Sequence, residues 1–245
     1  MGVPIVGCNC SVCRSDDPRD NRLRTSAMIE IGDVHLLIDT SSDFRQQMLR
    51  SGRQRLNAVL YTHHHVDHIL GLDDLRSLNF FQHRPIPIYA NRVTMENLRR
   101  VFTYVFNGQP SVSDIPRLEP HIIGNEPFEV DGVAVTPIPL LHGDLPILGY
   151  RIGNFAYCTD CSAIPQASLE LLKGLKILIL DALRFRTHPT HFSLEEARET
   201  AQKIAAERTY FIHLTHDVPH RQTDAQLPDG IFLAYDGLKL EIDAR

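Results

Sequence analysis

The sequence predicts several β-hairpins separated by helices, and this mixture limits the possible folds more than any other feature of the sequence. Apolar segments of strand length flank turn residues at 32–33, 131–132 and 153–154. Helical patterning lies between them, for example over about 92–106. Because strands and helices interleave while hairpins recur in both halves, we expect an α/β fold in which two sheets lie between helices. No low-complexity linker divides the sequence, so one domain over residues 1–245 is predicted.

Short apolar segments and capping signals predict the individual elements. We expect helices over about 41–50 (ended by Gly52), 72–82, 92–106, 166–173 and 193–207. We expect strands at 27–31, 34–38, 57–61, 86–89, 128–130, 133–136, 156–159, 176–180, 209–213, 231–235 and 238–242. The helix after Ser193 begins with a capping box, because Glu196 follows at the third position.

Composition excludes several classes of protein. Of the 245 residues, 43% are apolar and 22% are charged, which is ordinary for a globular domain. The net charge of -5 argues against nonspecific binding to nucleic acid or to an anionic membrane. No apolar run approaches the roughly 20 residues of a membrane span, and the N-terminus lacks the features of a signal peptide. We therefore expect a cytoplasmic protein.

A histidine cluster follows the strand predicted at 57–61. Residues 63–68 spell H-x-H-x-D-H, and His63 and His65 project to the same side of an extended loop. Asp67 and His68 follow after a bend and face a second point. Four such ligands cannot all bind one open catalytic ion, but they can bind two neighbouring ions. A solvated loop of unpaired histidines is the alternative. Single donors recur at strand ends, where loop sites are usually built: His142, Asp160 and His216.

These residues, in this order, resemble the metallo-β-lactamase superfamily of hydrolases over nearly the whole chain. The resemblance implies a four-layer αββα sandwich with a dinuclear metal site along one edge. Members usually begin with a strand and a Gly/Thr-rich turn upstream of the segment at 2–4. This chain starts at Met1 just beyond that point. Either the start of the chain is short, or the first sheet lacks an edge strand and exposes its neighbour.

The resemblance also implies roles for the individual donors. One metal is held by His63, His65 and His142, the other by Asp67, His68 and His216, and Asp160 bridges them. Asp39, at the end of the strand 34–38, is expected to orient a ligand histidine. Mixed histidine and carboxylate ligands suit manganese, zinc or iron, and we expect two divalent ions, Mn or Zn.

A second metal site is expected in the N-terminal loop of residues 1–24. Three thiols lie within six positions, at Cys8, Cys10 and Cys13, and three thiolates need a fourth ligand to close a structural zinc site. Reactive or incidental thiols are the alternative. Within the superfamily this C-x-C-x-x-C segment resembles the PhnP-like phosphoribosyl cyclic phosphate phosphodiesterases. There a histidine soon after the last active-site histidine completes the zinc site, which implies His220 here, with Asp217 and His213 as rivals.

Cys158 and Cys161 flank Asp160 as C-x-x-C. A redox motif needs a helix N-terminus to lower a thiol pKa, so we favour buried thiols beside a metal ligand.

The leaving alkoxide of a hydrolase needs a proton, and His191 is the candidate acid. It lies just before the helix predicted at 193–207, and its position resembles that of a non-ligand histidine in phosphodiesterase branches of the superfamily. A surface histidine at a helix entry is the alternative, and His188 is a nearby rival. His191 and Asp67 are the expected catalytic residues, while His64 is a bystander or a substrate contact.

The predicted function is a metal-dependent phosphodiesterase for small, cyclic ribose phosphates, acting through a hydroxide held between two metals. A tRNA 3′-processing endonuclease is the second choice, but that branch carries a long Gly- and Lys-rich arm between the equivalents of His142 and Asp160. Only 18 positions separate them here. A thioester or lactone hydrolase uses the same site and stays open. A non-catalytic zinc protein is disfavoured because no ligand is missing. The family suggests a homodimer.

Overall fold

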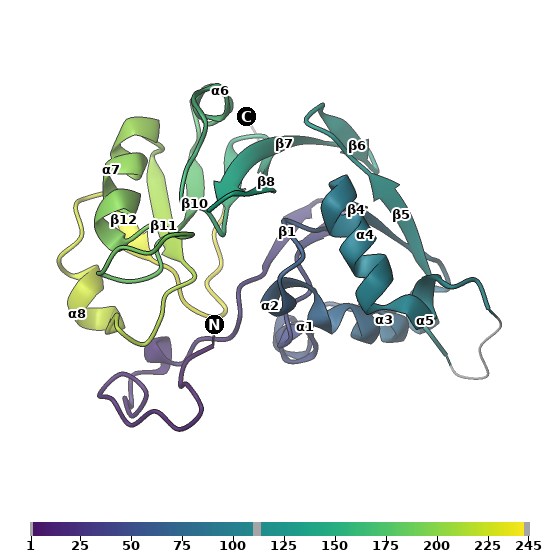
Figure 1. Ribbon diagram of the computed structural model, residues 1–245, viewed down its shortest axis with the longest axis horizontal. Coiled ribbons are helices and arrows are strands. Elements are labelled where there is room, and N and C mark those ends of the chain that lie inside the picture. Colours follow the sequence, from purple (N-terminus) through teal and green to yellow (C-terminus); the bar gives the residue numbers. More distant parts are fainter. Residues whose placement is uncertain (1, 110–113, 243–245) are drawn as a thin grey trace. The chain divides into compact units, whose positions relative to one another are not determined.

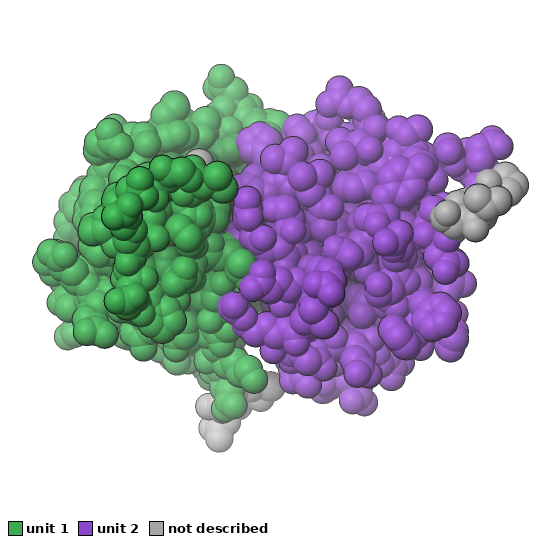
Figure 2. Space-filling model, turned by 90° about the horizontal axis from the view of Figure 1, so that it is seen from below, with its two compact units in different colours: residues 1–23, 135–245 green, residues 24–134 purple. Residues whose placement is uncertain are grey.

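The computed structural model describes residues 2–109 and 114–242 and divides the chain into two compact units. Unit 1 comprises residues 1–23 and 135–245, and unit 2 comprises residues 24–134; Figure 2 colours them separately. Each unit contains most of one sheet, so the prediction of a mixed α/β fold with two sheets is confirmed. The prediction of one domain stays a prediction.

Unit 2 is built on a five-stranded sheet in the order β1-β2-β3-β4-β5. Its strands are β1 (Ala27–Ile31), β2 (Val34–Ile38), β3 (Ala58–Leu60), β4 (Ile86–Ala90) and β5 (Leu118–Ile122). β1 and β2 form the predicted antiparallel hairpin, and the pairs from β2 to β5 are parallel. Parallel strands must be covered by their crossover helices, and β3 is accordingly buried along its whole length.

The helices of unit 2 are drawn beside this sheet in Figure 1. Their apolar side chains share a buried core cluster with its strands. The helices are α1 (Phe44–Ser51), α2 (Val66–Ile69), the 3-10 helix η2 (Leu70–Asp74), α3 (Leu75–Gln82), α4 (Arg92–Val101) and α5 (Thr103–Phe106). The Asn91 side chain accepts a hydrogen bond from Thr94 N at 2.8 Å and so starts α4. Met95 and Leu98, one turn apart, are fully buried in the same core as Ile88 of β4.

Unit 1 contains most of a seven-stranded sheet in the order β12-β11-β10-β9-β8-β7-β6. Its strands are β6 (Phe128–Val130), β7 (Val133–His142), β8 (Leu145–Ile152), β9 (Phe155–Cys158), β10 (Ile177–Asp181), β11 (Arg208–Ile212) and β12 (Ile231–Leu233). β7, β8 and β9 pair antiparallel, whereas β9 to β12 run parallel. The carboxyl ends of β7, β9, β10 and β11 therefore lie at one edge of the sheet.

The helices of unit 1 are η1 (Pro18–Asp20), α6 (Gln166–Leu171), α7 (Leu194–Ile204) and α8 (His220–Asp224). The predicted capping box of α7 is present: Glu196 N donates to Ser193 Oγ, and Ser193 N donates to Glu196 Oε2 at 2.8 Å. Buried residues of α7 recur at helical spacing and share a core cluster with β10, β11 and β12. Among the described residues, no helix is long and apolar enough to cross a bilayer.

The predictions of strands differ from the structure in several places, and β7, expected at 133–136, extends to His142. No strand forms in the described part of 238–242, whereas β5 (Leu118–Ile122) forms where none was expected. Two of the five residues of β5 are the poor strand formers Glu119 and Pro120, so its pattern was not recognised. β5 is the last strand in the order of its sheet, a place where proline is tolerated.

Candidate metal centres

The donors of unit 2 converge where β3 ends. His63 and His68 are fully buried, Asp67 is half-buried, and His65 is exposed at the start of α2. The ring centroid of His63 lies 4.6 Å from that of His65 and 4.2 Å from that of His68. Polar rings brought this close in a buried loop form a suitable donor set for divalent metal ions.

Asp39 is the carboxylate behind this loop. It follows β2, is fully buried, and has a positive φ of 60°. Its Oδ1 accepts a hydrogen bond from Thr62 N and its Oδ2 one from Thr62 Oγ1, each at 2.8 Å. Oδ2 also lies 2.8 Å from His68 Nδ1. Burial raises the pKa of Asp39, while His68 and Thr62 lower it. With Nδ1 donating to Asp39, Nε2 is the His68 nitrogen that can bind a metal.

The donors of unit 1 lie at the carboxyl ends of its strands. His142 ends β7, Asp160 follows β9, Asp181 ends β10, and His213 follows β11. All four side chains are buried, with exposed fractions between 0% and 7%. His213 Nε2 lies 3.2 Å from Asp160 Oδ2, and His213 Nδ1 lies 4.0 Å from Asp181 Oδ1. His142 Nδ1 lies 2.6 Å from Thr190 O, to which it donates, so its Nε2 can bind a metal.

The ring of His191 lies among these donors. Its centroid is 4.8 Å from that of His213 in a stacked arrangement, and 4.6 Å from that of His142 in an edge-on one. Its Nδ1 lies 2.8 Å from Asp181 Oδ2, which also accepts a hydrogen bond from Cys161 N at 2.9 Å. The structure therefore places the predicted acid in the site and holds it with a buried carboxylate.

Asp181 is a site residue that sequence reasoning did not predict. A single aspartate after an apolar strand is common in α/β proteins, so its position alone gave no reason to choose it. The usable signal was that Asp160 and Asp181 both lie at the ends of strands of the same parallel sheet, whose carboxyl ends must share one edge.

His216 belongs to the cysteine cluster, which corrects the prediction that it binds an active-site metal. Its Nδ1 lies 3.2 Å from Cys8 Sγ, 3.5 Å from Cys10 Sγ and 3.6 Å from Cys13 Sγ. In tetrahedral zinc, bond lengths of about 2.3 and 2.0 Å place sulfur and nitrogen ligands about 3.5 Å apart. The four donors therefore fit zinc.

One thiol of the cluster, that of Cys10, also favours the charge state that a metal needs. Cys13 N donates to Cys10 Sγ at 3.4 Å and, as the largest contribution, lowers the pKa of the Cys10 thiol to about 6. A thiolate is the form that binds zinc.

The structure places His220, the residue expected to be the fourth zinc ligand, outside the group formed by the three cysteines and His216. His220 begins α8 and is buried, and its backbone N donates to Asp20 Oδ1 at 2.8 Å. Its ring packs edge-on against Tyr235, and its Nδ1 has no hydrogen-bond partner in the described part of the chain. The rival Asp217 contacts Arg186 instead, at 3.3 Å. The other rival, His213, lies at the strand edge with Asp160.

Neither cysteine of the C-x-x-C segment resembles a redox thiol. Cys158 and Cys161 are fully buried and belong to the apolar core of unit 1. Burial raises the pKa of Cys158 to about 12 and raises that of Cys161 well above its usual range. The structure thus supports buried thiols beside Asp160.

The remaining histidines near the donors contribute less. His64 is half-buried, and burial lowers its pKa. His188 lies next to His191, with 5.1 Å between ring centroids, and burial lowers its pKa as well. Its Nδ1 accepts a hydrogen bond from Thr190 N at 3.3 Å, so it is turned towards its own loop.

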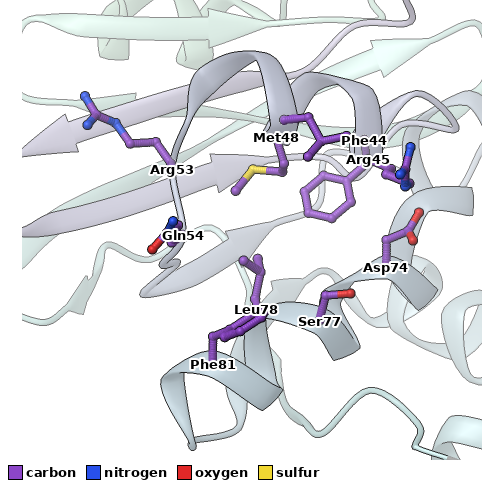
Figure 3. A pocket seen from close by; sticks show the side chains of 10 residues that line it. Phe44, Arg45, Met48, Arg53, Gln54, Asp74, Ser77, Leu78 and Phe81 are labelled. Carbon is purple, nitrogen blue, oxygen red and sulfur yellow. The ribbon is translucent and has the colours of Figure 1, made fainter.

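A hollow of about 380 Å³ in unit 2 lies away from these donor sets (Figure 3). It opens between α1 and α3, with Phe44, Met48 and Leu78 directed into it and Arg45 and Asp74 at one end. No histidine or cysteine lines it. It is therefore an apolar groove and not a metal centre.

Comparison with known proteins assigns the family. Residues 35–214 match the family described as "Beta-lactamase superfamily domain", and this range covers most of the chain. The chain belongs to the beta-lactamase superfamily. The predicted superfamily is thereby confirmed, and the two sheets of the structure are those of this fold.

Three known proteins are similar to this chain. A crystal structure of a diphosphatase from the PhnP family is 48% identical, with a TM-score of 0.92, covering 98% of this chain and 92% of that one. An octanoyltransferase of Porphyromonas gingivalis is 42% identical over 100% of this chain, but the chain spans only 50% of that relative's length. A ribonuclease Z of a Mycobacterium species (strain KMS) is 26% identical, covering 82% of this chain and 80% of the relative. The predicted resemblance to PhnP-like proteins is thus confirmed.

Replacing His216 and His220 by alanine, one at a time, tests which histidine completes the zinc site. We expect His216→Ala to lose the zinc held by the three cysteines, because no fourth ligand remains. His220→Ala is expected to keep that zinc, since its ring does not face the thiols. Zinc bound per chain after dialysis against a weak chelator measures both. Retention by His216→Ala together with loss by His220→Ala would restore the assignment made from the sequence.

Proposed function

We propose that this member of the beta-lactamase superfamily is a metal-dependent phosphodiesterase that hydrolyses small phosphodiesters, cyclic ribose phosphates first among them. The observation that carries the proposal is the His191–Asp181 pair among the buried donors at the strand edge of unit 1. A proton donor held beside metal ligands is what cleavage of a phosphodiester needs at its leaving oxygen. The 48% identity to a PhnP-family diphosphatase supports hydrolysis at phosphorus.

The donors divide between two metal ions by the pattern of the superfamily, with His213 taking the role predicted for His216. We propose that His63, His65 and His142 hold one ion, that Asp67, His68 and His213 hold the other, and that Asp160 bridges them. When bound, two divalent ions lower the pKa of water and neutralise charge on a phosphate. Nitrogen and carboxylate donors suit both Mn²⁺ and Zn²⁺.

His191 supplies the proton for the leaving group. Its Nδ1 donates to Asp181 Oδ2 at 2.8 Å, which fixes both the tautomer and the plane of the ring. The proton to be transferred is then the one on Nε2. Asp181 is itself held by Cys161 N, so the imidazole cannot turn without breaking a buried hydrogen bond.

The ribonuclease Z relative favours a second candidate, a tRNA 3′-processing endonuclease. The segment between His142 and Asp160 argues against it. That segment is taken up by the hairpin of β8 (Leu145–Ile152) and β9 (Phe155–Cys158), so no basic arm is inserted. With a net charge of -5, we propose a small-molecule substrate and no nucleic acid partner. A homodimer and a cytoplasmic location stay predictions.

Substrate class is tested by hydrolysis of bis(p-nitrophenyl) phosphate. Protein stripped of metal and reloaded with Mn²⁺ or Zn²⁺ is compared on this diester, on p-nitrophenyl phosphate and on a thioester. We expect metal to restore turnover of the diester well above that of the other two. Preference for the thioester, or inactivity with both metals bound, would contradict the proposal. Asp160→Ala is the matched inactive control, and it keeps the zinc of the cysteine cluster.

Leaving-group dependence tests the role of His191. A p-nitrophenolate leaves with little help, whereas an alkoxide needs a proton. We therefore expect His191→Ala to lower kcat about 10²–10³-fold for an alkyl diester and much less for bis(p-nitrophenyl) phosphate. The metal content should be unchanged, and His188→Ala should match the parent on both substrates. Loss of an active-centre metal in His191→Ala would make this histidine a ligand and refute the assignment.

A further inference from the structure

Arg22 is a cation buried between two distant segments of unit 1. It is 7% exposed and pairs with the equally buried Asp20 at 3.2 Å. Its Nη1 donates to Thr215 O at 2.7 Å, and its Nη2 donates to Val218 O at 2.6 Å. A buried charge is tolerated only where hydrogen bonds replace its water, so these two carbonyls must stay in place.

The same loop carries the cysteine cluster's histidine. His216 lies between the two carbonyls that Arg22 binds, and its Nδ1 faces the thiols of the N-terminal segment. Asp20 Oδ1, the partner of Arg22, also accepts a hydrogen bond from His220 N. The N-terminal segment therefore holds residues 215–220 through the guanidinium, the cluster and a carboxylate.

His213 lies two residues before this anchored loop. Its backbone φ is 65°, in the left-handed region that residues with a side chain adopt only when their surroundings hold them there. β11 ends at Ile212, so the sheet does not extend to His213. The contact of His213 Nε2 with Asp160 Oδ2 at 3.2 Å thus depends on the loop that begins after His213.

We propose that Arg22 is a positioning residue of the active centre: together with the cysteine cluster it fixes residues 215–220 and thereby His213, which lies two residues before them. The two metal centres are then coupled, and disturbing the N-terminal segment weakens metal binding at the strand edge. This inference rests on the proposed function only in taking His213 as a ligand of an active-centre metal.

The affinity for Mn²⁺ tests this coupling separately from activity. Mn²⁺ prefers nitrogen and oxygen donors to thiolates, so it reports on the active centre and not on the cysteine cluster. The signal of free Mn²⁺ in electron paramagnetic resonance gives the dissociation constant. It is measured for the parent, Arg22→Met and Arg22→Lys, with zinc content and melting temperature recorded in parallel.

Arg221→Met is the matched control. Arg221 also faces the N-terminal segment, 3.7 Å from Asp17, but its side chain is 89% exposed. We expect Arg22→Met to bind Mn²⁺ at least tenfold more weakly, Arg22→Lys to fall between it and the parent, and Arg221→Met to match the parent. Lysine is expected to restore part of the Mn²⁺ affinity, because it keeps the positive charge but can bind only one of the two carbonyls.

A merely structural role for Arg22 would lower the melting temperature and leave the Mn²⁺ dissociation constant within twofold of the parent, and this result would overturn the inference. Should Arg22→Met fail to fold, Arg22→Lys decides: weaker binding supports the coupling, and unchanged binding refutes it. A parent that binds Mn²⁺ but cleaves no diester would contradict the proposed function and leave this comparison intact. A parent that binds neither Mn²⁺ nor Zn²⁺ outside the cysteine cluster would refute both.

Discussion

Buried carboxylates at strand ends are the constraint on which the candidate active centre depends. Asp39 follows β2 in unit 2 and Asp181 ends β10 in unit 1, and both are fully buried. A carboxylate removed from water must be compensated by donors, and in each case a backbone N–H and an imidazole provide them. Each carboxylate in turn fixes the orientation of the histidine that donates to it. The Nε2 of His68 is thereby left for the proposed metal, and that of His191 for the proposed proton transfer.

Parallel strands explain why these residues meet. The register of β9, β10 and β11 aligns Cys158 with Leu180, and Asp181 with Ile212. Residues directly after these strands must therefore lie at one edge, whatever the sequence between the strands. This register therefore brings the candidate donors of unit 1 together. The helix α7, which lies between β10 and β11 in the sequence, packs its buried side chains into the same core cluster as these strands.

The loop after β11 contacts both candidate metal centres of unit 1. His213 and His216 are three residues apart, yet one contacts Asp160 and the other the three thiols. By the coupling proposed above, the N-terminal segment thus stabilises a loop that follows His213, the proposed active-centre ligand. A single loop that holds donors for two centres leaves little freedom for either histidine to move.

Much of this architecture could be predicted from the sequence. Alternation and turn residues predicted the hairpin of β1 and β2 to the residue, and the capping box predicted the start of α7. The histidine cluster and the cysteine cluster could be recognised from spacing alone. The choice between His213 and His216 could not, because it depends on where β11 ends and on a positive φ at His213. The resemblance to the superfamily assigned His216 to the active centre. The zinc ligand was then expected at the histidine that follows, His220.

Anomalous diffraction from crystals of the metal-loaded protein tests the account most directly. We predict one metal peak bound by Cys8, Cys10, Cys13 and His216, and a pair of peaks bound in part by His142, Asp160 and His213. His191 should stay hydrogen-bonded to Asp181 with its Nε2 directed towards the pair and bound to neither ion. A metal bound by His216 together with Asp160, or by His191, would contradict the account.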